Sequence, residues 1–420
     1  MRNHNPFPFW MPWSIVLIVS LASGYSSESS GETNRQDSDR DYFSATAKSE
    51  EMTAENYYNR GVDFTDENEY EKALEYYDLA IETEPEYYRA WWGKGYALRE
   101  LEQYADALIA YDRAVEIDPN DSELWFSKAY THQEYEQYEL AVESYTQAIT
   151  LMPENTYAWY NRGRAYRQLE KYAEALADFD RVIEINADDA DAWYRRGRVL
   201  VMLDRYNEAV VSYQQAIAIN PQDFHAFKER GIVLLELDKY AAAVRSFRQA
   251  LEIDSNRLSA WKYLGEALYK QQKYEDALAA FDRAVKIDSK NVKLWVDRGD
   301  AAYYASRYKK AVASYNKAIE IDSKDANIWI YRGNAFSKLE KETQALSSYN
   351  KAIEIDANNA FAWFNRGLTL ASIEKYDEAL DSYNKGLAIE PDNSQARRLR
   401  ERILMLKQGG ERSGVVSIAN

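Results

Sequence analysis

The sequence has 420 residues and a formal net charge of −17, and it contains no cysteine. The missing cysteines exclude disulfides and thiolate chemistry. The acidic balance disfavours nucleic acids and anionic membrane surfaces as partners, because both are bound through basic faces. A solvated acidic exterior that keeps a long molecule soluble is the simplest interpretation of the charge.

Residues 1–24 differ from everything that follows them. A short start containing Arg2 precedes a mostly apolar run from Trp13 to Ala22, and small residues follow it. This is the layout of a secretory signal peptide. The run is short for a membrane-spanning helix, which needs about 20 apolar residues. The segment therefore predicts a cleaved signal peptide, with an uncleaved membrane anchor as the alternative. Either way we expect an exported protein, periplasmic in a bacterium or secreted, or one tethered to a membrane by this segment alone.

Residues 25–53 are rich in Ser, Thr, Asp and Glu and carry few apolar side chains. Such a segment cannot bury enough apolar surface to offset the entropy of ordering. It predicts a disordered acidic linker.

Residues 54–393 repeat one pattern with a period of 34 residues, in ten units without an insertion. Counted from Ala54, the fourth residue is Trp in eight units and the eighth is Gly in nine. The twentieth is Ala in all ten units, and the twenty-fourth is always Tyr or Phe. A fixed period of this length marks an array of stacked supersecondary units.

Each unit has the spacing of two amphipathic helices. In the unit that starts at Ala190, Trp193, Gly197 and Leu200 share one helix face, and Tyr206 and Tyr213 belong to a second helix. Small residues let the two helices approach while the aromatics fill the gaps beside them. We expect the fourth-position Trp193 to be a core residue whose truncation costs roughly 3–5 kcal/mol. One pair cannot bury its own aromatics, so each unit needs its neighbours.

On these residues the sequence resembles the tetratricopeptide repeat family, whose unit is two antiparallel helices. The resemblance covers residues 54–393. It implies an all-α, right-handed superhelical solenoid of ten antiparallel helix pairs. In this family the first helix of each pair lines the concave face, so the second, fifth, ninth, twelfth and thirteenth positions are expected to point into a groove.

At those positions the first five units carry aromatic residues and arginines. Such residues supply much of the energy of protein interfaces. The resemblance therefore implies a groove for an extended peptide or partner protein, with these candidates: Tyr58, Arg89, Trp92, Tyr96, Phe126, Tyr130, Tyr160, Arg164, Tyr194 and Arg198. The structural alternative is that the fifth-position aromatics pack against neighbouring helices. On the groove interpretation, truncating Trp92 and Tyr160 should weaken partner binding and barely change the melting temperature.

The seventh position is Arg in seven units and Lys in two. A charge that recurs with the repeat is expected to pair with carboxylates at the same repeat spacing, as a structural ladder.

Residues 394–408 do not follow the repeat and form an apolar stripe flanked by Arg and Lys. An array needs a terminal helix to cover its last exposed core, so we predict a capping helix here, with a basic membrane-contact helix as the alternative. Residues 409–420 predict a disordered tail.

No catalytic constellation is recognisable. The chain has three histidines and no glycine-rich phosphate loop. His132 is expected to be a satisfied, half-buried side chain. The clamp by which some family members hold chaperone C-termini needs Lys fifth and Asn ninth, whereas Lys228 and Lys262 are followed by Ile232 and Glu266. We predict no enzyme, no cofactor and no metal. The expected function is a protein-binding scaffold in the assembly of an envelope or membrane complex; the alternative is a self-associating structural protein whose groove docks another copy.

Overall fold

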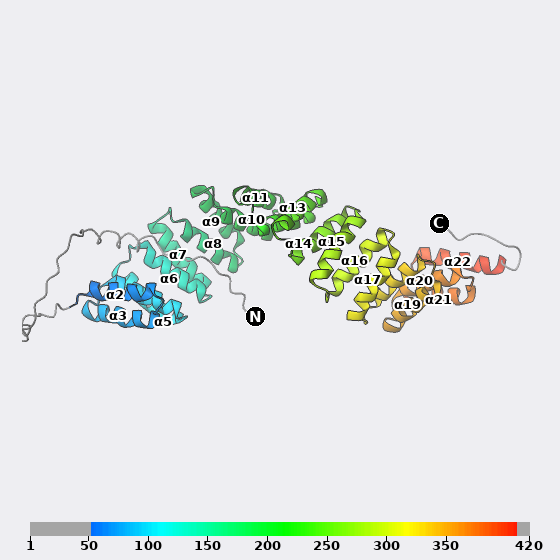
Figure 1. The fold of residues 1–420 in the computed structure, drawn as a ribbon, viewed down its shortest axis with the longest axis horizontal. Helices are drawn as coiled ribbons and strands as arrows, with labels where there is room; N and C mark the ends of the chain where they lie inside the picture. Colours follow the sequence, from blue (N-terminus) through cyan, green and yellow to red (C-terminus); the bar gives the residue numbers. More distant parts are fainter. Residues whose placement is uncertain (1–51, 410–420) are drawn as a thin grey trace, which may run out of the picture. The chain divides into compact units, whose positions relative to one another are not determined.

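The structure is a computed structural model, and it describes residues 52–409. Over this range every regular element is an α-helix, and Figure 1 shows the helices following one another in chain order. Their bounds are α2 (Ala54–Asp66), α3 (Tyr70–Thr83), α4 (Tyr88–Glu100), α5 (Tyr104–Ile117), α6 (Ser122–Glu134), α7 (Tyr138–Leu151), α8 (Thr156–Gln168), α9 (Tyr172–Ile185), α10 (Ala190–Met202), α11 (Tyr206–Ile219), α12 (Phe224–Glu236), α13 (Tyr240–Ile253), α14 (Leu258–Lys270), α15 (Tyr274–Ile287), α16 (Val292–Tyr304), α17 (Tyr308–Ile321), α18 (Ala326–Ser337), α19 (Glu342–Ile355), α20 (Ala360–Ser372), α21 (Tyr376–Ile389) and α22 (Ser394–Gly409).

Each repeat unit is one helix pair, from α2 with α3 to α20 with α21. The second helix of a pair also packs against the first helix of the next, so the pairs stack in sequence order. The final helix, α22, packs on α21 where the capping helix was predicted. The expected all-α solenoid of ten helix pairs is confirmed.

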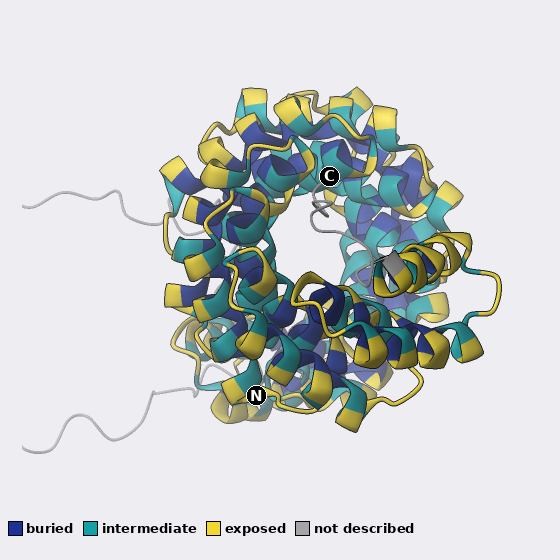
Figure 2. Ribbon diagram, turned by 90° about the vertical axis from the view of Figure 1, so that its right-hand side faces the viewer, coloured by how far each residue is buried: buried dark blue, intermediate teal, exposed yellow. Residues whose placement is uncertain are grey.

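The interior of each pair is built from small residues around one large ring. In the fifth unit Ala209 and Ala216 are fully buried, and Tyr213 beside them is 1% exposed. A Cβ atom on Gly197 would stand 2.7 Å from the Tyr213 ring, so glycine is required by the close approach of α10 to that ring. Figure 2 shows the buried faces turned toward neighbouring helices, with the exposed residues concentrated along the outer rim and the turns.

The turn inside each pair ends the first helix in the same way in every unit. The fifteenth residue of every unit has a φ between 55° and 64° although it is never glycine. In the first unit the N–H of Glu69 donates to the carbonyl of Phe64 at 2.8 Å, and the N–H of Asn68 donates to Thr65 at 3.0 Å. This pair of bonds is the Schellman motif, which satisfies the last free carbonyls of the first helix.

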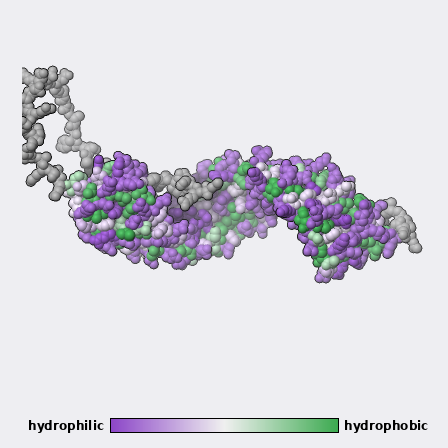
Figure 3. Space-filling model, turned by 90° about the horizontal axis from the view of Figure 1, so that it is seen from below, coloured by the Kyte–Doolittle hydropathy of each residue, from purple (hydrophilic) through white to green (hydrophobic). Residues whose placement is uncertain are grey.

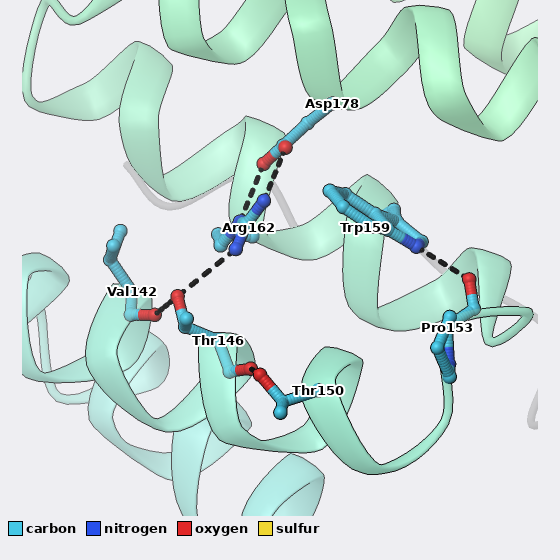
Figure 4. A network of polar contacts seen from close by, with 7 residues as sticks. All are labelled: Val142, Thr146, Thr150, Pro153, Trp159, Arg162 and Asp178. Carbon is cyan, nitrogen blue, oxygen red and sulfur yellow. Dashed lines mark hydrogen bonds and ion pairs between the residues drawn. The ribbon is translucent and has the colours of Figure 1, made fainter.

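The turn between pairs is fastened by the fourth-position tryptophans. The Trp159 Nε1–H donates to the Pro153 carbonyl at 2.9 Å, as Figure 4 shows, and Trp193 makes the same bond to Ala187. Trp193 is only partly buried, so the expectation that it is a core residue is wrong. It ties its helix to the preceding turn while one part of the indole stays in contact with water. In α22 the equivalent residue is Arg397, whose Nε donates to the Pro391 carbonyl at 2.8 Å.

The predicted ladder of seventh-position cations has carboxylate partners at the repeat spacing in five units. For Arg230, Arg332 and Arg366 the prediction of carboxylates is wrong, because serine hydroxyls take that place, and Arg60 pairs with Asp63 of its own helix. Arg162 donates to both carboxylate oxygens of Asp178 on its own pair and to Thr146 on the preceding pair, so it links two units (Figure 4). The cations and one acceptor each are Lys94 with Asp78, Lys128 with Asp112, Arg162 with Asp178, Arg196 with Asp180, Arg230 with Ser246, Arg298 with Asp282, Arg332 with Ser348 and Arg366 with Ser382. Their role is structural.

Three predictions concern residues that the structure does not describe. The signal peptide or anchor at 1–24, nearly all of the linker at 25–53 and the tail beyond residue 409 lie outside the described range. Between residues 52 and 409, no helix has both the length and the apolar composition that crossing a bilayer requires.

Candidate functional site

The ten predicted groove residues lie on five successive first helices: α2, α4, α6, α8 and α10. Arg89 is exposed, and the other nine are partly buried. All nine therefore keep some contact with solvent, and none is sealed between units. Whether they contact a partner stays a prediction.

The fifth-position aromatics have a structural role as well. Four of them contact the buried ring at position twenty-four of their own unit, and each contact brings two helices together. The pairs, with the distance between ring centroids, are Tyr58 and Tyr77 at 5.8 Å, Phe126 and Tyr145 at 5.6 Å, Tyr160 and Phe179 at 5.7 Å, and Tyr194 and Tyr213 at 5.8 Å. Edge and offset contacts of this kind stabilise packing by about 0.5–1.5 kcal/mol. The groove interpretation and the packing alternative therefore both describe these residues.

Trp92 joins two units directly. Its Nε1–H donates to the Ser127 hydroxyl at 2.9 Å, from α4 to α6, and its ring packs against a cluster that includes Leu98 and Tyr111. Truncating Trp92 would remove this packing and leave the Ser127 hydroxyl without its donor. We therefore expect such a substitution to lower the melting temperature as well, in contrast to what the groove interpretation by itself predicts.

Tyr160 makes a similar link from α8 to α10. Its hydroxyl donates to the Asp191 carboxylate, and the Arg195 Nε–H donates to the same hydroxyl at 2.9 Å. Burial and the Asp191 charge raise the pKa of Tyr160, so it stays protonated at neutral pH. Arg195 was missed by the sequence analysis because it stands at the sixth position, which the family pattern does not assign to the groove.

In units two and three, two predicted groove residues surround a neutralised cation. The Arg99 guanidinium lies 4.6 Å from the Tyr96 ring centroid and 5.2 Å from that of Tyr130. It also pairs with Glu100 and, at 3.6 Å, with Glu134. Two of the predicted residues, Tyr96 and Tyr130, thus enclose an internal ion pair.

Units four and five differ, because the arginines at their predicted groove positions lack carboxylate partners. Arg164 donates to the side-chain oxygen of Asn161 at 3.1 Å, and Arg167 donates to that of Gln168 at 3.0 Å. Among the described residues, no carboxylate lies within ion-pair distance of Arg164, Arg167 or Arg198. Burial, followed by the charges of Arg198, Arg195 and Arg164, lowers the pKa of Arg167.

In unit eight the ninth position, which is Arg in units four and five, carries the carboxyl group of Asp300. Asp300 accepts a hydrogen bond from the Tyr315 hydroxyl at 2.7 Å, and burial raises its pKa to about 6. The neighbouring Asp297 pairs with Lys293 at 2.6 Å.

Two hollows among the described residues lie elsewhere. One of about 350 Å³ is bordered by Trp91, Lys94 and Ile109, and one of about 240 Å³ by Trp125 and Lys128. Both combine a fourth-position Trp with a seventh-position Lys, so they are the same structural feature in two units. None of the ten predicted groove residues borders either hollow. We infer that they follow from the repeat packing.

No metal-binding cluster of three or more His, Asp or Glu side chains occurs within residues 52–409. His132 is buried, and its Nδ1 is 2.8 Å from the Gln137 side-chain oxygen, which agrees with a satisfied structural histidine. Burial lowers its pKa.

Comparisons with known proteins agree on one kind of repeat. Models described as "Tetratricopeptide repeat" match residues 58–122, 110–143, 156–189, 190–223, 228–292 and 360–393, and a model described as "TPR repeat" matches residues 299–340 and 333–373. A search of curated proteins finds no match.

Solved structures with the same kind of repeat are similar over part of the chain. YrrB, described as a protein "with an unusual peptide-binding site", is 24% identical, with 45% of this chain and 97% of that one covered and a TM-score of 0.40. MamA is 20% identical, with 39% and 96% covered and a TM-score of 0.37. The C-terminal part of a repeat protein from Cytophaga hutchinsonii is 19% identical, with 57% and 98% covered and a TM-score of 0.49.

Proposed function

Since the chain belongs to the tetratricopeptide repeat family, whose members are in general non-catalytic interaction scaffolds, we propose that its first helices form a groove that holds an extended segment of a partner protein. The observation that carries the proposal is the row of five aromatic rings on successive first helices, all partly accessible: Tyr58, Trp92, Phe126, Tyr160 and Tyr194. A segment crossing these helices would meet one ring in each unit. Each ring is held by its neighbours, so little side-chain entropy is lost on binding.

A photo-crosslinking amino acid placed in the groove tests this proposal. Tyr157 stands at the second position of its unit on α8 and is 60% exposed, so it can be replaced without disturbing the packing. We expect a crosslinker at position 157 to capture a protein in cells. The matched control is the exposed Ala177 on α9, the second helix of the same pair. Equal capture from both positions, or none from position 157, would contradict the groove proposal.

We further propose that the chain is exported, or tethered through residues 1–24, and helps to assemble or hold an envelope or membrane complex. The support is the signal-like layout of residues 1–24. Cell fractionation combined with the mass of the mature chain tests this: export with cleavage removes about the first 24 residues. An intact chain recovered in the cytosol would refute it.

Self-association is the second candidate, and exposed apolar residues of the last unit favour it. Phe361 is 63% exposed, and Leu368 beside it on α20 is also exposed. Figure 3 shows a surface that is mainly hydrophilic with small hydrophobic groups between. A molar mass that rises with concentration, and no longer does so after Phe361→Ser, would establish this alternative. A concentration-independent monomer would exclude it.

A further inference from the structure

Two sets of arginines on the first helices differ in their partners. Those at the seventh position each have a carboxylate, hydroxyl or amide acceptor from the repeat, as the ladder shows. Arg164, Arg167 and Arg198, on α8 and α10, form no ion pair with the described residues. Other arginines without an ion pair, such as Arg245 and Arg248, are exposed, whereas these three are partly buried.

Two of the three, Arg164 and Arg198, are predicted groove residues, and Arg195 lies between the rings of Tyr160 and Tyr194. The Arg195 guanidinium is 6.0 Å from the Tyr160 ring centroid and 5.7 Å from that of Tyr194, and the Arg198 guanidinium is 6.0 Å from the Tyr194 ring centroid. Arg195 is engaged by Asp191 at 3.4 Å. Glu229, a carboxylate that influences the pKa of Tyr194, pairs with Lys228 at 2.8 Å.

This arrangement has an energetic cost that a bound anion would remove. Arg167 is partly buried, and its Nε–H is buried without an acceptor. Its pKa is lowered by burial and by the like charges of Arg198, Arg195 and Arg164. Collecting like charges in a partly desolvated place is unfavourable, and an anion there would gain short, charge-assisted hydrogen bonds. Repulsion between like-charged side chains in the unliganded protein is typical of a ligand-binding site.

We propose that Arg164, Arg167 and Arg198 form a subsite for the carboxylate side chains of an acidic stretch within the partner segment. The subsite rests on the groove function proposed above and specifies the chemistry of its partner. The aromatic rings of Tyr160 and Tyr194 would hold the segment while the guanidinium groups select acidic residues. A single-stranded nucleic acid could also use arginines and rings, and the test below distinguishes it from an acidic segment. The subsite also differs from the chaperone clamp, because it needs no free C-terminal carboxylate.

Fluorescence anisotropy with the purified chain tests this. The probe is a short labelled peptide of alternating Glu and Ser with an amidated C-terminus, and the matched probe has Gln in place of Glu. We expect the Glu peptide to bind at least about tenfold more tightly than the Gln peptide, and its affinity to fall with added NaCl. Arg198→Gln should weaken Glu-peptide binding by about tenfold, and Arg164→Gln with Arg198→Gln by about a hundredfold.

The matched control is Arg248→Gln, which removes the same charge from an exposed residue on α13. It should leave the affinity unchanged, and unchanged melting of all variants would show that the fold is retained. Equal effects of Arg198→Gln and Arg248→Gln would overturn the subsite, because net charge alone would then explain binding. So would failure of the Glu peptide to bind, or tighter binding of a single-stranded oligonucleotide. In any of these cases, capture of a protein from position 157 would leave the groove function standing.

Discussion

Ten residues of the array adopt a backbone conformation that their side chains disfavour. The fifteenth residue of each unit lies in the left-handed region, yet it is Asn, Asp, Glu, Gln or Ser and never Gly. A residue with a Cβ atom is less stable there by roughly 1 kcal/mol. The Schellman hydrogen bonds hold the conformation in place in every unit.

Glu102→Gly should therefore stabilise its unit. Glu102 has a φ of 58° and an exposed side chain, so glycine removes strain without loss of packing. We expect the local free energy of opening of α4 and α5, measured by hydrogen exchange, to rise by about 0.5–1 kcal/mol. Glu116→Gly is the control: this exposed residue is helical, so glycine should lower the same free energy by a similar amount. A loss of stability with Glu102→Gly would show that the greater freedom of glycine in the unfolded chain outweighs the backbone strain relieved at this position.

At the scale of the elements, two neighbouring helix pairs make the same hydrogen bond with different acceptors. The buried Tyr315 of α17 donates to Asp300 of α16, and the equivalent Tyr349 of α19 donates to Asn334 of α18 at 2.8 Å. The hydrogen bond is the same, but only the carboxylate carries a charge into the packed region. Burial accordingly raises the pKa of Asp300 to about 6.

This difference predicts a pH dependence confined to α16 and α17. The folded state holds the Asp300 proton more tightly than the unfolded chain, so stability is complete at acid pH and falls as pH rises from about 4 to about 6. Asp300→Asn should abolish this dependence and raise the local stability at pH 7 by roughly 2–3 kcal/mol. Hydrogen exchange as a function of pH provides the measurement.

The reciprocal variant is the control. Asn334→Asp should introduce the same acid-to-neutral loss of stability into α18 and α19. If Asp300→Asn lowered stability at pH 7, the carboxylate would be contributing attraction that outweighs its burial, and the sign of the predicted pH dependence would be wrong.

For the array as a whole, the core is a series of contacts between adjacent units, and the last unit depends on α22. Ile403 of α22 is 3% exposed and packs in a cluster with Leu370 and Tyr383. A solenoid opens most easily at an end whose last core is uncovered.

Ile403→Asp should therefore open the array from its C-terminal end. An unpaired carboxylate in this cluster should cost about 3 kcal/mol or more of local stability in α20 and α21. Hydrogen exchange in α2 and α3 should remain unchanged, because stability is passed only between neighbours. Met405→Asp, at a residue of the same helix that is 69% exposed, should have little effect. Uniform loss of protection along the chain would contradict nearest-neighbour stabilisation.

Much of the fold follows from the sequence because every contact recurs at a fixed offset along the chain. A cation at the seventh position meets an acceptor sixteen residues away, as Arg196 meets Asp180 and Ser212. Helix pairs, the glycine beside Tyr213 and the ladder could all be predicted on this basis. Each unit touches only its neighbours, so no distant part of the chain can alter the pattern.

The tertiary structure decided what periodicity does not encode. A recurring Trp at the fourth position is typical of a core residue, but stacking leaves Trp193 partly exposed as the donor that fastens a turn. Likewise, the family pattern places arginines and aromatics in a groove without stating their partners. Only side-chain packing shows that Arg99 is neutralised by Glu100 and Glu134 while Arg198 is not. The reason is that repeat spacing specifies which helices meet, whereas the pairing of charges and the exposure of each ring depend on rotamers and neighbours from two units at once.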